Sequence, residues 1–571
     1  MRERSATIVA ERTAAAWWLR RPALSLALLV VLLNLNSIRA FFVGDDFDYL
    51  RWFQRKGLGR AITLQFWGEW EPAWYLTWFF DQTLWRTNPV GFHLQNVVWL
   101  VLLVLALFHL VRELRPASPL AAWAAALLFA TNPLHDEAVV YLAARGHLMC
   151  AAFSVAALWL YVRSRRHAGA GRSRWRLLLA AWTATALAIL SKEIALLLPL
   201  WVAALEWGVL TGGGRRLRRT VLGAAGFVLP AAATVALRAA VVGLGSDKLA
   251  GATDGPGEMF AALARDLPGY ALLGALPLPF ALLDGTFLER FRWLGLAALA
   301  AAALAGAAAV VRQSRRGGEP HPGSGFYLFA LTVASTSLFP VFWADLDLRR
   351  RYLFVPSVGI ALVAALVLER LGPRLAPLVL GVLVVAGSAA TLHRNDLYRR
   401  AGVVARNMIE AIRQAPIGQP LAPRPRGRAV LVSLPDRYGG DSVSGAYLFH
   451  RTDFVSALTV FGVAQQSIDY ALRPDHGQDH TAEVTGRGAA GLDVRVSFRS
   501  RRAFDDARRN DPASNPHGKL VRATRIDVDP QARTMTFRLT VDPEFRRSAS
   551  VLYLYTDGTL VPILPEPAAR P

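Results

Sequence analysis

The sequence predicts an all-α polytopic membrane bundle followed by a small, mainly β domain outside the membrane. Three observations lead to this prediction. Apolar residues make up 53% of the 571 residues and charged residues only 19%, whereas about a quarter are charged in soluble proteins. Long apolar runs alternate with short basic clusters as far as residue 391. Strict alternation of apolar and polar residues, which is typical of strands, occurs only after residue 428.

The charge pattern indicates membrane lipids as partners. The chain has 64 basic and 42 acidic residues and a net charge of +22, which is also typical of nucleic-acid-binding proteins. Here, however, the basic residues form short clusters between apolar runs instead of one long polar face, so we expect no nucleic acid partner. The one cysteine, Cys150, lies in an apolar stretch, which excludes a disulfide framework and a thiolate metal site.

Eleven apolar runs are predicted to be membrane-spanning helices, although several are shorter than the roughly 20 residues that cross an untilted bilayer. Such short helices usually end beside a protein-lined cavity. The first run has no small-residue cleavage site after it, so we expect a retained span. A further run, 267–283, contains three prolines and is predicted to be re-entrant or interfacial. The eleven runs are 22–43, 92–111, 119–134, 147–162, 176–190, 194–210, 220–242, 293–311, 326–343, 353–369 and 374–391.

The short loops predict the orientation. Arginine-rich segments at 1–22, 163–176, 211–220 and 312–316 fall on one side of the membrane if the eleven spans hold, and the positive-inside rule makes that side cytoplasmic. An odd number of spans then places the C-terminus on the opposite side. We therefore predict a multi-pass protein of the plasma (inner) membrane with a cytoplasmic N-terminus and an extracytoplasmic (periplasmic) C-terminal domain.

Three regions follow from these patterns. Residues 1–392 form the membrane domain, and 393–428 form an amphipathic helix with a proline-rich linker. Residues 429–571 form the β-rich domain, in which 492–498 and 535–541 alternate strictly. No repeat with a period of 20 to 50 residues is visible, which argues against a helical repeat array.

Adjacent carboxylates Asp45 and Asp46 follow the first span. Two neighbouring carboxylates repel each other, so one should hold its proton more tightly unless a cation compensates, and such a group can act as a general base. We expect Asp46 to be the base and Asp45 to be held by a cation such as Arg39, which otherwise snorkels to the interface. The plainer interpretation is a helix end with solvated acids.

Three further loops carry charged groups on the same predicted side, and charges at membrane depth are functional candidates by default. The simpler interpretations are a Lys192–Glu193 ion pair and lipid-headgroup anchoring by part of the arginine run. His135, Glu137 and His147 offer a possible divalent metal site, although their spacing is a weak signal. The loops contain His135, Asp136, Glu137, Arg145 and His147; Lys192 and Glu193; and Asp345, Asp347, Arg349, Arg350, Arg351 and Tyr352.

A tryptophan stripe lies in the first outer loop. Trp67, Trp70, Trp74 and Trp78 share one face of a predicted helix. Such a stripe is more often an interfacial belt than a sugar platform, so we expect this loop to lie flat on the membrane.

Four ordered motifs carry a resemblance to a known family. WEPAWYLTWFFDQTLWRTNPVGFHLQNVV is followed by NPLHDEAVVYLAARGHLM, LSKEIALLLPL and RRRYLFVPSVG. Over about residues 20–400 these resemble the transmembrane O-mannosyltransferase type of the GT-C glycosyltransferase superfamily, including its bacterial relatives. The resemblance implies transfer of mannose or a similar hexose from a polyprenyl-phosphate carrier to an extracytoplasmic hydroxyl on protein, lipid or glycan.

The resemblance also implies roles for individual residues. Asp45 and Asp46 match the acidic pair of the family's first outer loop. The departures are Glu71 where relatives usually have arginine, His147 where an acidic residue is common, and Arg350 where an acidic residue usually precedes Arg-Tyr. These departures leave sugar and acceptor identity open. The other matches are His135, Glu137 and Arg145 in the second loop, Lys192 and Glu193 in the third, and Arg351 with Tyr352 on the phosphate side.

Residues and resemblance predict the same mechanism. Arg351, Arg145 and Lys192 would stabilise the charge that develops on the leaving phosphate, while an aspartate takes the acceptor's proton in one inverting displacement. A lipid-linked saccharide transporter or flippase, a non-catalytic scaffold and a saccharide polymerase or ligase are the alternatives. The flippase would use charges near the bilayer midplane and internal symmetry, and no such symmetry is visible. No cofactor follows from the sequence beyond the possible divalent metal.

Overall fold

The structure is a computed structural model of the full chain. It describes residues 21–55, 57–63, 65, 69–166, 171–211, 215–243, 256–277, 290–315, 322–338 and 349–414 of the N-terminal part. In the C-terminal part it describes 428–432, 434–439, 446–449, 451–462, 468–472, 480–488, 491–498, 501–509, 511–514, 520–543, 545, 550–556 and 558–563. Asp345, Asp347, Trp67 and the end of the 267–283 run lie outside these residues.

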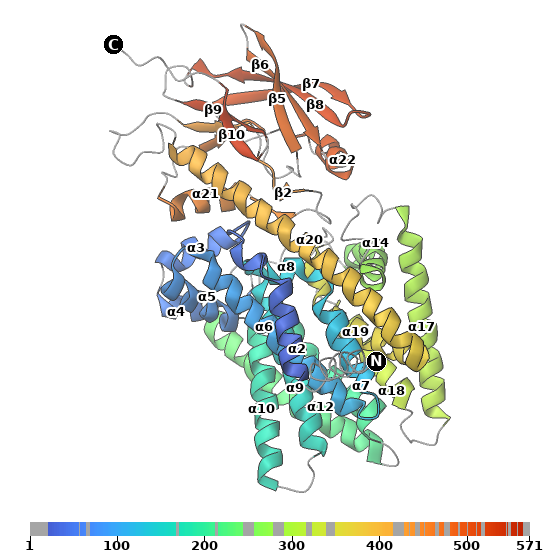
Figure 1. Ribbon diagram of the computed structural model, residues 1–571. Coiled ribbons are helices and arrows are strands. Elements are labelled where there is room, and N and C mark those ends of the chain that lie inside the picture. The colour runs from blue at the N-terminus through green and yellow to red at the C-terminus, as the bar shows by residue number, and fades with distance from the viewer. Residues whose placement is uncertain are drawn as a thin grey trace, which may run out of the picture.

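The N-terminal part is a bundle of helices, and α3, α4 and α5, which lie between α2 and α6 in the chain, gather at the end of the bundle nearer the C-terminal sheets (Figure 1). Its elements are α2 (Pro22–Leu33), η1 (Ser37–Arg39), α3 (Asp46–Arg55), α4 (Leu58–Thr63), α5 (Pro72–Trp85), α6 (Pro89–Leu114), α7 (Pro119–Ala130), η2 (Pro133–His135), α8 (Asp136–Val139), η3 (Leu142–Ala144), α9 (Arg145–Arg166), α10 (Gly171–Ser191), η4 (Glu193–Leu197), α11 (Leu198–Leu205), η5 (Glu206–Leu210), α12 (Arg216–Val242), α14 (Pro256–Ala275), α17 (Arg292–Ser314), α18 (Pro322–Thr336), η8 (Arg350–Leu353), α19 (Pro356–Arg370) and α20 (Gly372–Gln414).

Within the described residues, six helical segments are long and apolar enough to cross a membrane, and α2 and α7 are shorter apolar helices. The chain is therefore a multi-pass membrane protein by length and composition, while the count of about eleven spans stays a prediction. Only 17% of the apolar windows of α12 and α17 is buried inside the protein, so their exposed aliphatic side chains face lipid. The six segments are Pro89–Leu114, Leu142–Arg166, Glu193–Leu210, Arg216–Val242, Arg292–Gln313 and Gly372–Gln414.

The first predicted span does not form one helix. Helix α2 stops at Leu33, because Asn34 donates from its side chain to the Val30 carbonyl oxygen and Ser37 donates to the Asn34 carbonyl oxygen. Such local hydrogen bonds compete with helix continuation. The chain then runs through η1 and extended residues to the acidic pair.

Helix α20 continues through the predicted boundary at residue 392 and leaves the bundle towards the C-terminal sheets (Figure 1). Its second half is the predicted amphipathic helix, with Val404, Met408, Ile409 and Ile412 buried.

The described residues of the C-terminal part form two four-stranded sheets, the two-stranded pair β2–β3 and two helices (Figure 1). One sheet has the order β10-β9-β1-β4, in which β1 pairs in parallel with β4 and β9. The other is antiparallel with the order β5-β6-β8-β7, and the predicted alternation of β6 and β8 is confirmed by their inward apolar residues. The elements are β1 (Ala429–Leu431), β2 (Arg437–Tyr438), β3 (Ala446–Tyr447), α21 (Arg451–Val460), β4 (Ile468–Tyr470), β5 (His480–Gly488), β6 (Gly491–Phe498), α22 (Arg501–Arg509), β7 (Val521–Asp529), β8 (Thr534–Val541), β9 (Val551–Thr556) and β10 (Thr559–Pro562).

The C-terminal part packs directly on the first outer loop. One continuous apolar core joins that loop, the end of α20 and the first sheet, and in it Phe47 stacks on Phe449 with 5.4 Å between ring centroids. Trp74 and Trp78 are buried in the same core. The prediction of an interfacial tryptophan belt is therefore wrong, because these rings pack against aromatic side chains inside the protein.

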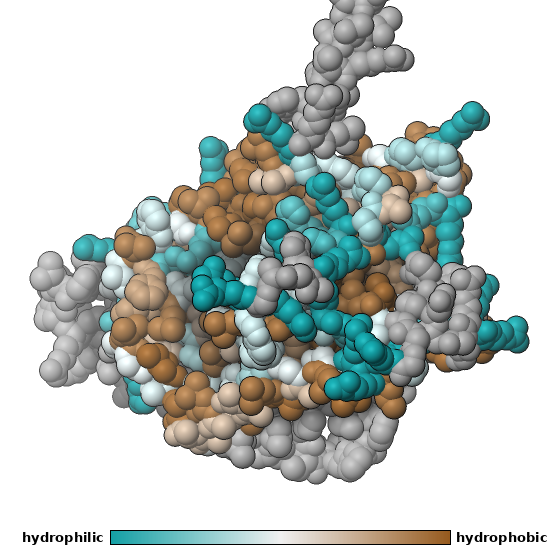
Figure 2. All heavy atoms as spheres, turned by 90° about the horizontal axis from the view of Figure 1, so that it is seen from below, coloured by the Kyte–Doolittle hydropathy of each residue, from teal (hydrophilic) through white to brown (hydrophobic). Residues whose placement is uncertain are grey.

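The two ends of the bundle differ. The arginine-rich last turn of α9 and first turns of α10 lie at the end opposite the sheets (Figure 1). Seen from that end, hydrophilic residues gather towards the middle of the face and hydrophobic residues lie around much of its rim (Figure 2). This distribution fits a bundle whose sides contact lipid.

Candidate active site

Asp45 lies in a sharp turn and Asp46 is the first residue of α3. Gly44 has a φ of +54°, and a Cβ atom there would lie 3.3 Å from the Tyr141 ring, so the turn requires glycine. The Gly44 N–H donates to the Leu448 carbonyl oxygen at 3.0 Å, and the Asp45 N–H donates to the Tyr141 hydroxyl at 3.2 Å. The turn is thereby held between the second outer loop and the C-terminal part.

The two carboxylates have different surroundings. The Asp46 side chain is fully buried and accepts N–H hydrogen bonds from Ala143 at 2.8 Å and Val43 at 3.1 Å. Burial raises the pKa of Asp46 well above its usual value, although these hydrogen bonds oppose the rise. Asp45 is only partly buried. Arg39 is exposed, and within the described residues it forms no ion pair with either aspartate, so the expected compensation by Arg39 is absent there.

The segment that contains Asp136 and Glu137 meets the segment that contains Arg350 and Arg351, and Arg394 of α20 joins them. We call these five residues the arginine cluster. Arg350 Nε lies 3.0 Å from Asp136 Oδ1, and Arg394 Nη2 lies 2.7 Å from Asp136 Oδ2. Arg351 Nη1 lies 3.3 Å from Glu137 Oε1. Burial alone would raise the pKa of Asp136, but Arg350 and Arg394 outweigh burial and hold it below its usual value. Helices α8, η8 and α20 are tied together by these pairs.

The two histidines of the second loop do not form a metal site with Glu137. His135 Nε2 lies 2.8 Å from Ser357 Oγ, its ring packs against Phe129 and Phe354, and burial lowers its pKa to about 3. The His147 ring packs edge-on against Tyr352 at 5.7 Å. Among the described residues the group that brings three possible metal ligands together is Glu69, Glu71 and Glu193 instead.

Arg145 is completely buried and surrounded by protein acceptors. Its Nη1 lies 2.7 Å from Asp81 Oδ2, its Nε donates to Asn96 Oδ1 at 2.6 Å, and its Nη2 donates to the Phe92 carbonyl oxygen at 3.0 Å. It also donates to Gln95 and Thr77. Every nitrogen of the guanidinium group is engaged within the protein, so this side chain is suited to holding helices together.

Lys192 lies among three carboxylates in a group that we call the lysine cluster: Lys192, Glu69, Glu71 and Glu193. Its Nζ lies 2.7 Å from Glu69 and 3.9 Å from Glu193, and it donates to Glu71, which also accepts from Trp74. Burial raises the pKa of Glu71 to about 8. The carboxylate oxygens lie within 4.8 Å of one another and could hold a cation, but the ammonium group lies among them. Glu71, the departure from the family pattern, is thus the lysine's partner.

Several residues of the site escaped sequence reasoning. Asp81 and Arg394 lie inside helices, where nothing but their charge in an apolar context marks them. Arg437 and Tyr447 come from the C-terminal part, in the β2–β3 hairpin. Tyr447 stacks on Tyr141 with 4.5 Å between centroids and accepts a hydrogen bond from Arg351 at 3.3 Å. No short-range signal connects residues so far apart in the chain.

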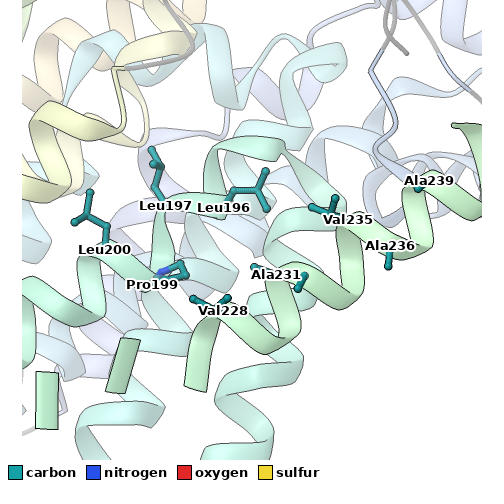
Figure 3. A pocket seen from close by; sticks show the side chains of 10 residues that line it. Leu196, Leu197, Pro199, Leu200, Val228, Ala231, Val235, Ala236 and Ala239 are labelled. Atoms are coloured by element: carbon teal, nitrogen blue, oxygen red, sulfur yellow. The ribbon is translucent and has the colours of Figure 1, made fainter. Parts of the chain in front are cut away.

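An apolar groove runs between α11 and α12 below η4 (Figure 3). Its walls carry aliphatic side chains, alanine and proline, among them Leu196, Leu200, Val228 and Val235. An apolar groove of this kind suits contact with acyl chains in a bilayer.

Comparisons with known proteins agree with the resemblance read from the motifs. No protein-family model matches the chain. A protein O-mannosyl-transferase of Caenorhabditis elegans is 28% identical over 161 residues, which cover 25% of this chain and 23% of that protein. A protein O-mannosyl-transferase of Drosophila melanogaster is 32% identical over 185 residues, which cover 29% of this chain and 20% of that protein. The matches span less than a quarter of either relative.

Solved structures give weaker similarities. The oligosaccharyltransferase AglB of Archaeoglobus fulgidus, in complex with an inhibitory peptide and a dolichol-phosphate, has a TM-score of 0.41 at 13% identity, covering 80% of this chain and 64% of that chain. ArnT of Cupriavidus metallidurans bound to undecaprenyl phosphate has a TM-score of 0.34 at 14% identity, covering 93% and 99%. With TM-scores below 0.5, these similarities decide nothing about function.

Proposed function

We propose that this chain is a membrane glycosyltransferase that moves a hexose, mannose or similar, from a polyprenyl-phosphate carrier to an extracytoplasmic hydroxyl. The observation that supports the proposal most strongly is the partly exposed Asp45 beside the arginine cluster. Tyr141 connects them, because its hydroxyl accepts from the Asp45 N–H and its ring lies 5.7 Å from the Arg351 guanidinium carbon. A candidate base and a cation for the leaving phosphate therefore lie on two sides of one tyrosine.

The proposed chemistry is a single displacement. The acceptor oxygen forms a bond to C1 of the sugar while the C1–O bond to phosphate breaks. The bonding pair goes to the leaving polyprenyl phosphate, which gains a second negative charge, and Arg351 stabilises that charge. The acceptor's proton goes to an aspartate, and the anomeric centre is inverted.

Within this proposal Asp45 is the base and Asp46 is a positioning residue. A base must contact the acceptor hydroxyl, and Asp46 is fully buried with both carboxylate oxygens engaged by backbone N–H groups. The two environments thus favour the reverse of the preference that sequence position suggested. Asp46 instead holds the Val43 and Ala143 backbone so that the turn keeps its shape.

The other predicted donor contacts divide into two groups. Arg351 and Tyr352 remain the proposed contacts to the donor phosphate. Arg351 pairs with one carboxylate, that of Glu137, and its side chain is partly exposed, so it can still reach a ligand. Arg145 and Lys192 become positioning residues in the proposal, because their charges are already neutralised by Asp81 and by the glutamates of the lysine cluster. His135, Glu137, Glu193 and His147 support the loops, and no metal is part of the proposed step.

The proposed orientation keeps the N-terminus in the cytoplasm and the C-terminal part outside the plasma (inner) membrane. It is supported by the arginines at the end of α9 and the start of α10, since these helix ends lie opposite the C-terminal sheets (Figure 1). The acceptor, on protein, lipid or glycan, would then approach Asp45 from the side of the C-terminal part.

The test is turnover of the purified full chain with a panel of polyprenyl-phosphate sugars, followed as release of polyprenyl phosphate. Asp45→Asn should bind donor normally and lose about a hundred to ten thousand fold in turnover, because asparagine cannot accept the proton. Asp46→Asn should lower thermal stability in addition to turnover, because the NH2 group of the new amide would face a backbone N–H donor. Normal turnover in Asp45→Asn would remove the catalytic role of this turn, and no turnover with any lipid-linked sugar would favour the flippase or scaffold.

A further inference from the structure

The β2–β3 hairpin brings a second cation to the arginine cluster from the C-terminal part. The guanidinium carbon of Arg437 lies 3.5 Å from the centroid of the Tyr447 ring. Because Tyr447 also stacks on Tyr141 at an interplanar angle of 19°, the tyrosine ring lies between Tyr141 and Arg437. The Tyr447 hydroxyl contacts Arg351. Tyr447 therefore contacts the guanidinium groups of both Arg351 and Arg437, which are 86 residues apart in the chain.

Arg437 is nearly completely buried, and its guanidinium group is only partly satisfied by the surrounding protein. It is 4% exposed, and among the described residues its Nη1 has no hydrogen-bond partner, although the Asp436 and Glu137 carboxylates lie within electrostatic range. The carboxylates of the arginine cluster are held by other arginines, namely Arg350 and Arg394 on Asp136 and Arg351 on Glu137. Within the described part of the chain, Arg437 forms no ion pair. Burying a guanidinium group with an unsatisfied donor costs free energy, and a bound anion that accepts from this donor would offset the cost.

A second unsatisfied donor lies close by. The Nε of Arg349 is buried without a hydrogen-bond partner, and Arg349 lies within electrostatic range of both Tyr447 and Arg437. Several guanidinium groups converging on one place suit a phosphate, whose terminal oxygens accept from more than one planar donor at once. A carboxylate and the donor phosphodiester each offer two terminal oxygens, and the polyprenyl phosphate that leaves offers three.

We propose that Arg437, carried by the C-terminal part, binds the phosphate of the lipid-linked donor together with Arg351. This inference rests on the proposed function and adds to it, because the C-terminal part then completes the donor site. Tyr447 is a positioning residue that sets the spacing of the two arginines. The same hairpin also holds the turn of the base, since Leu448 accepts the Gly44 N–H next to Asp45.

The experiment compares binding of undecaprenyl phosphate and of the neutral undecaprenol to the full chain in detergent or nanodiscs. The wild-type protein should prefer the phosphate. Arg437→Gln should weaken undecaprenyl phosphate binding about tenfold or more, the value of one charge-assisted hydrogen bond, and leave undecaprenol binding unchanged. Arg437→Lys should keep part of the preference. The matched control is Arg495→Gln, an exposed arginine of β6 paired with Glu483, which should change neither affinity.

The ratio of the two affinities separates a phosphate contact from a folding defect, since a disturbed hairpin would weaken both ligands together. An unchanged ratio in Arg437→Gln would overturn the inference while leaving the proposed function intact. A wild-type protein without preference for the phosphate would instead contradict the proposed function. Vesicles of phosphatidylglycerol distinguish the source of the phosphate: equal competition by this lipid would show a general headgroup site and overturn the donor role of Arg437.

Discussion

The lysine cluster and the arginine cluster are both buried charge networks next to outer loops, but their charge balances are opposite. The lysine cluster places one cation among Glu69, Glu71 and Glu193. The arginine cluster places three cations against Asp136 and Glu137. The first has excess negative charge and repels a phosphate, while the second has excess positive charge and attracts one. The sign of the excess, and not the mere presence of cations at membrane depth, indicates where a phosphate binds.

Removing the one cation of the lysine cluster should have the largest effect on stability. Lys192→Met removes the cation that pairs with Glu69 and Glu71, and breaking a buried pair costs about 3 to 5 kcal/mol. Thermal unfolding of the purified protein measures this. The control is Arg413→Ala, which breaks an exposed pair with Glu410 and should hardly change the thermal stability. Unchanged stability in Lys192→Met would mean that the cluster is not a structural network.

The arginine cluster should respond in ligand affinity. Arg351→Ala would remove the proposed contact to the donor phosphate, and we expect a loss of about 2 to 5 kcal/mol in binding of undecaprenyl phosphate. Arg400→Ala, an exposed arginine paired with Asp396, serves as the control. If Lys192→Met weakened donor binding as much as Arg351→Ala did, at a temperature where both are folded, the contrast between the clusters would be lost.

The pH dependence of stability should sharpen the comparison. Burial raises the folded-state pKa of Glu71 to about 8, so the folded chain binds this proton more tightly than the unfolded chain, whose pKa is about 4.5. Stability from this group is fully present below about pH 4.5 and is lost as the pH rises through about 8. Glu71→Gln should remove this dependence, which we expect to be on the order of 2 to 4 °C in melting temperature. A pH profile unchanged by Glu71→Gln contradicts the assignment.

Arg39 belongs to neither cluster and should give the smallest effect. It is exposed and pairs with neither aspartate within the described residues, so Arg39→Ala should change stability by less than about 0.5 kcal/mol. The turnover of Arg39→Ala, measured in the same assay as that of Asp45→Asn, should equal the wild-type value. A turnover defect in Arg39→Ala would restore it as the cation that holds the acidic pair.

Local patterns were enough to predict much of this protein. Apolar runs predicted the helical bundle, because a membrane helix must be apolar along its length. Two-residue alternation predicted β6 and β8, because strand side chains point to opposite faces. Charges in an apolar context marked Asp45, Asp46, Glu137, Lys192 and Arg351 as candidates, since such charges are rare without a role.

Only the tertiary structure decided which charges are paired and which remain to meet a ligand. Arg145 and Lys192 looked like phosphate contacts until Asp81 and Glu71 appeared beside them, and neither partner is close in sequence. Arg437 carried no signal at all, because its place at the arginine cluster depends on the docking of a hairpin from the C-terminal part. A pattern reports how a residue relates to its own helix or strand. Charge compensation depends on distances across the fold, and these are set by packing between segments far apart in the chain.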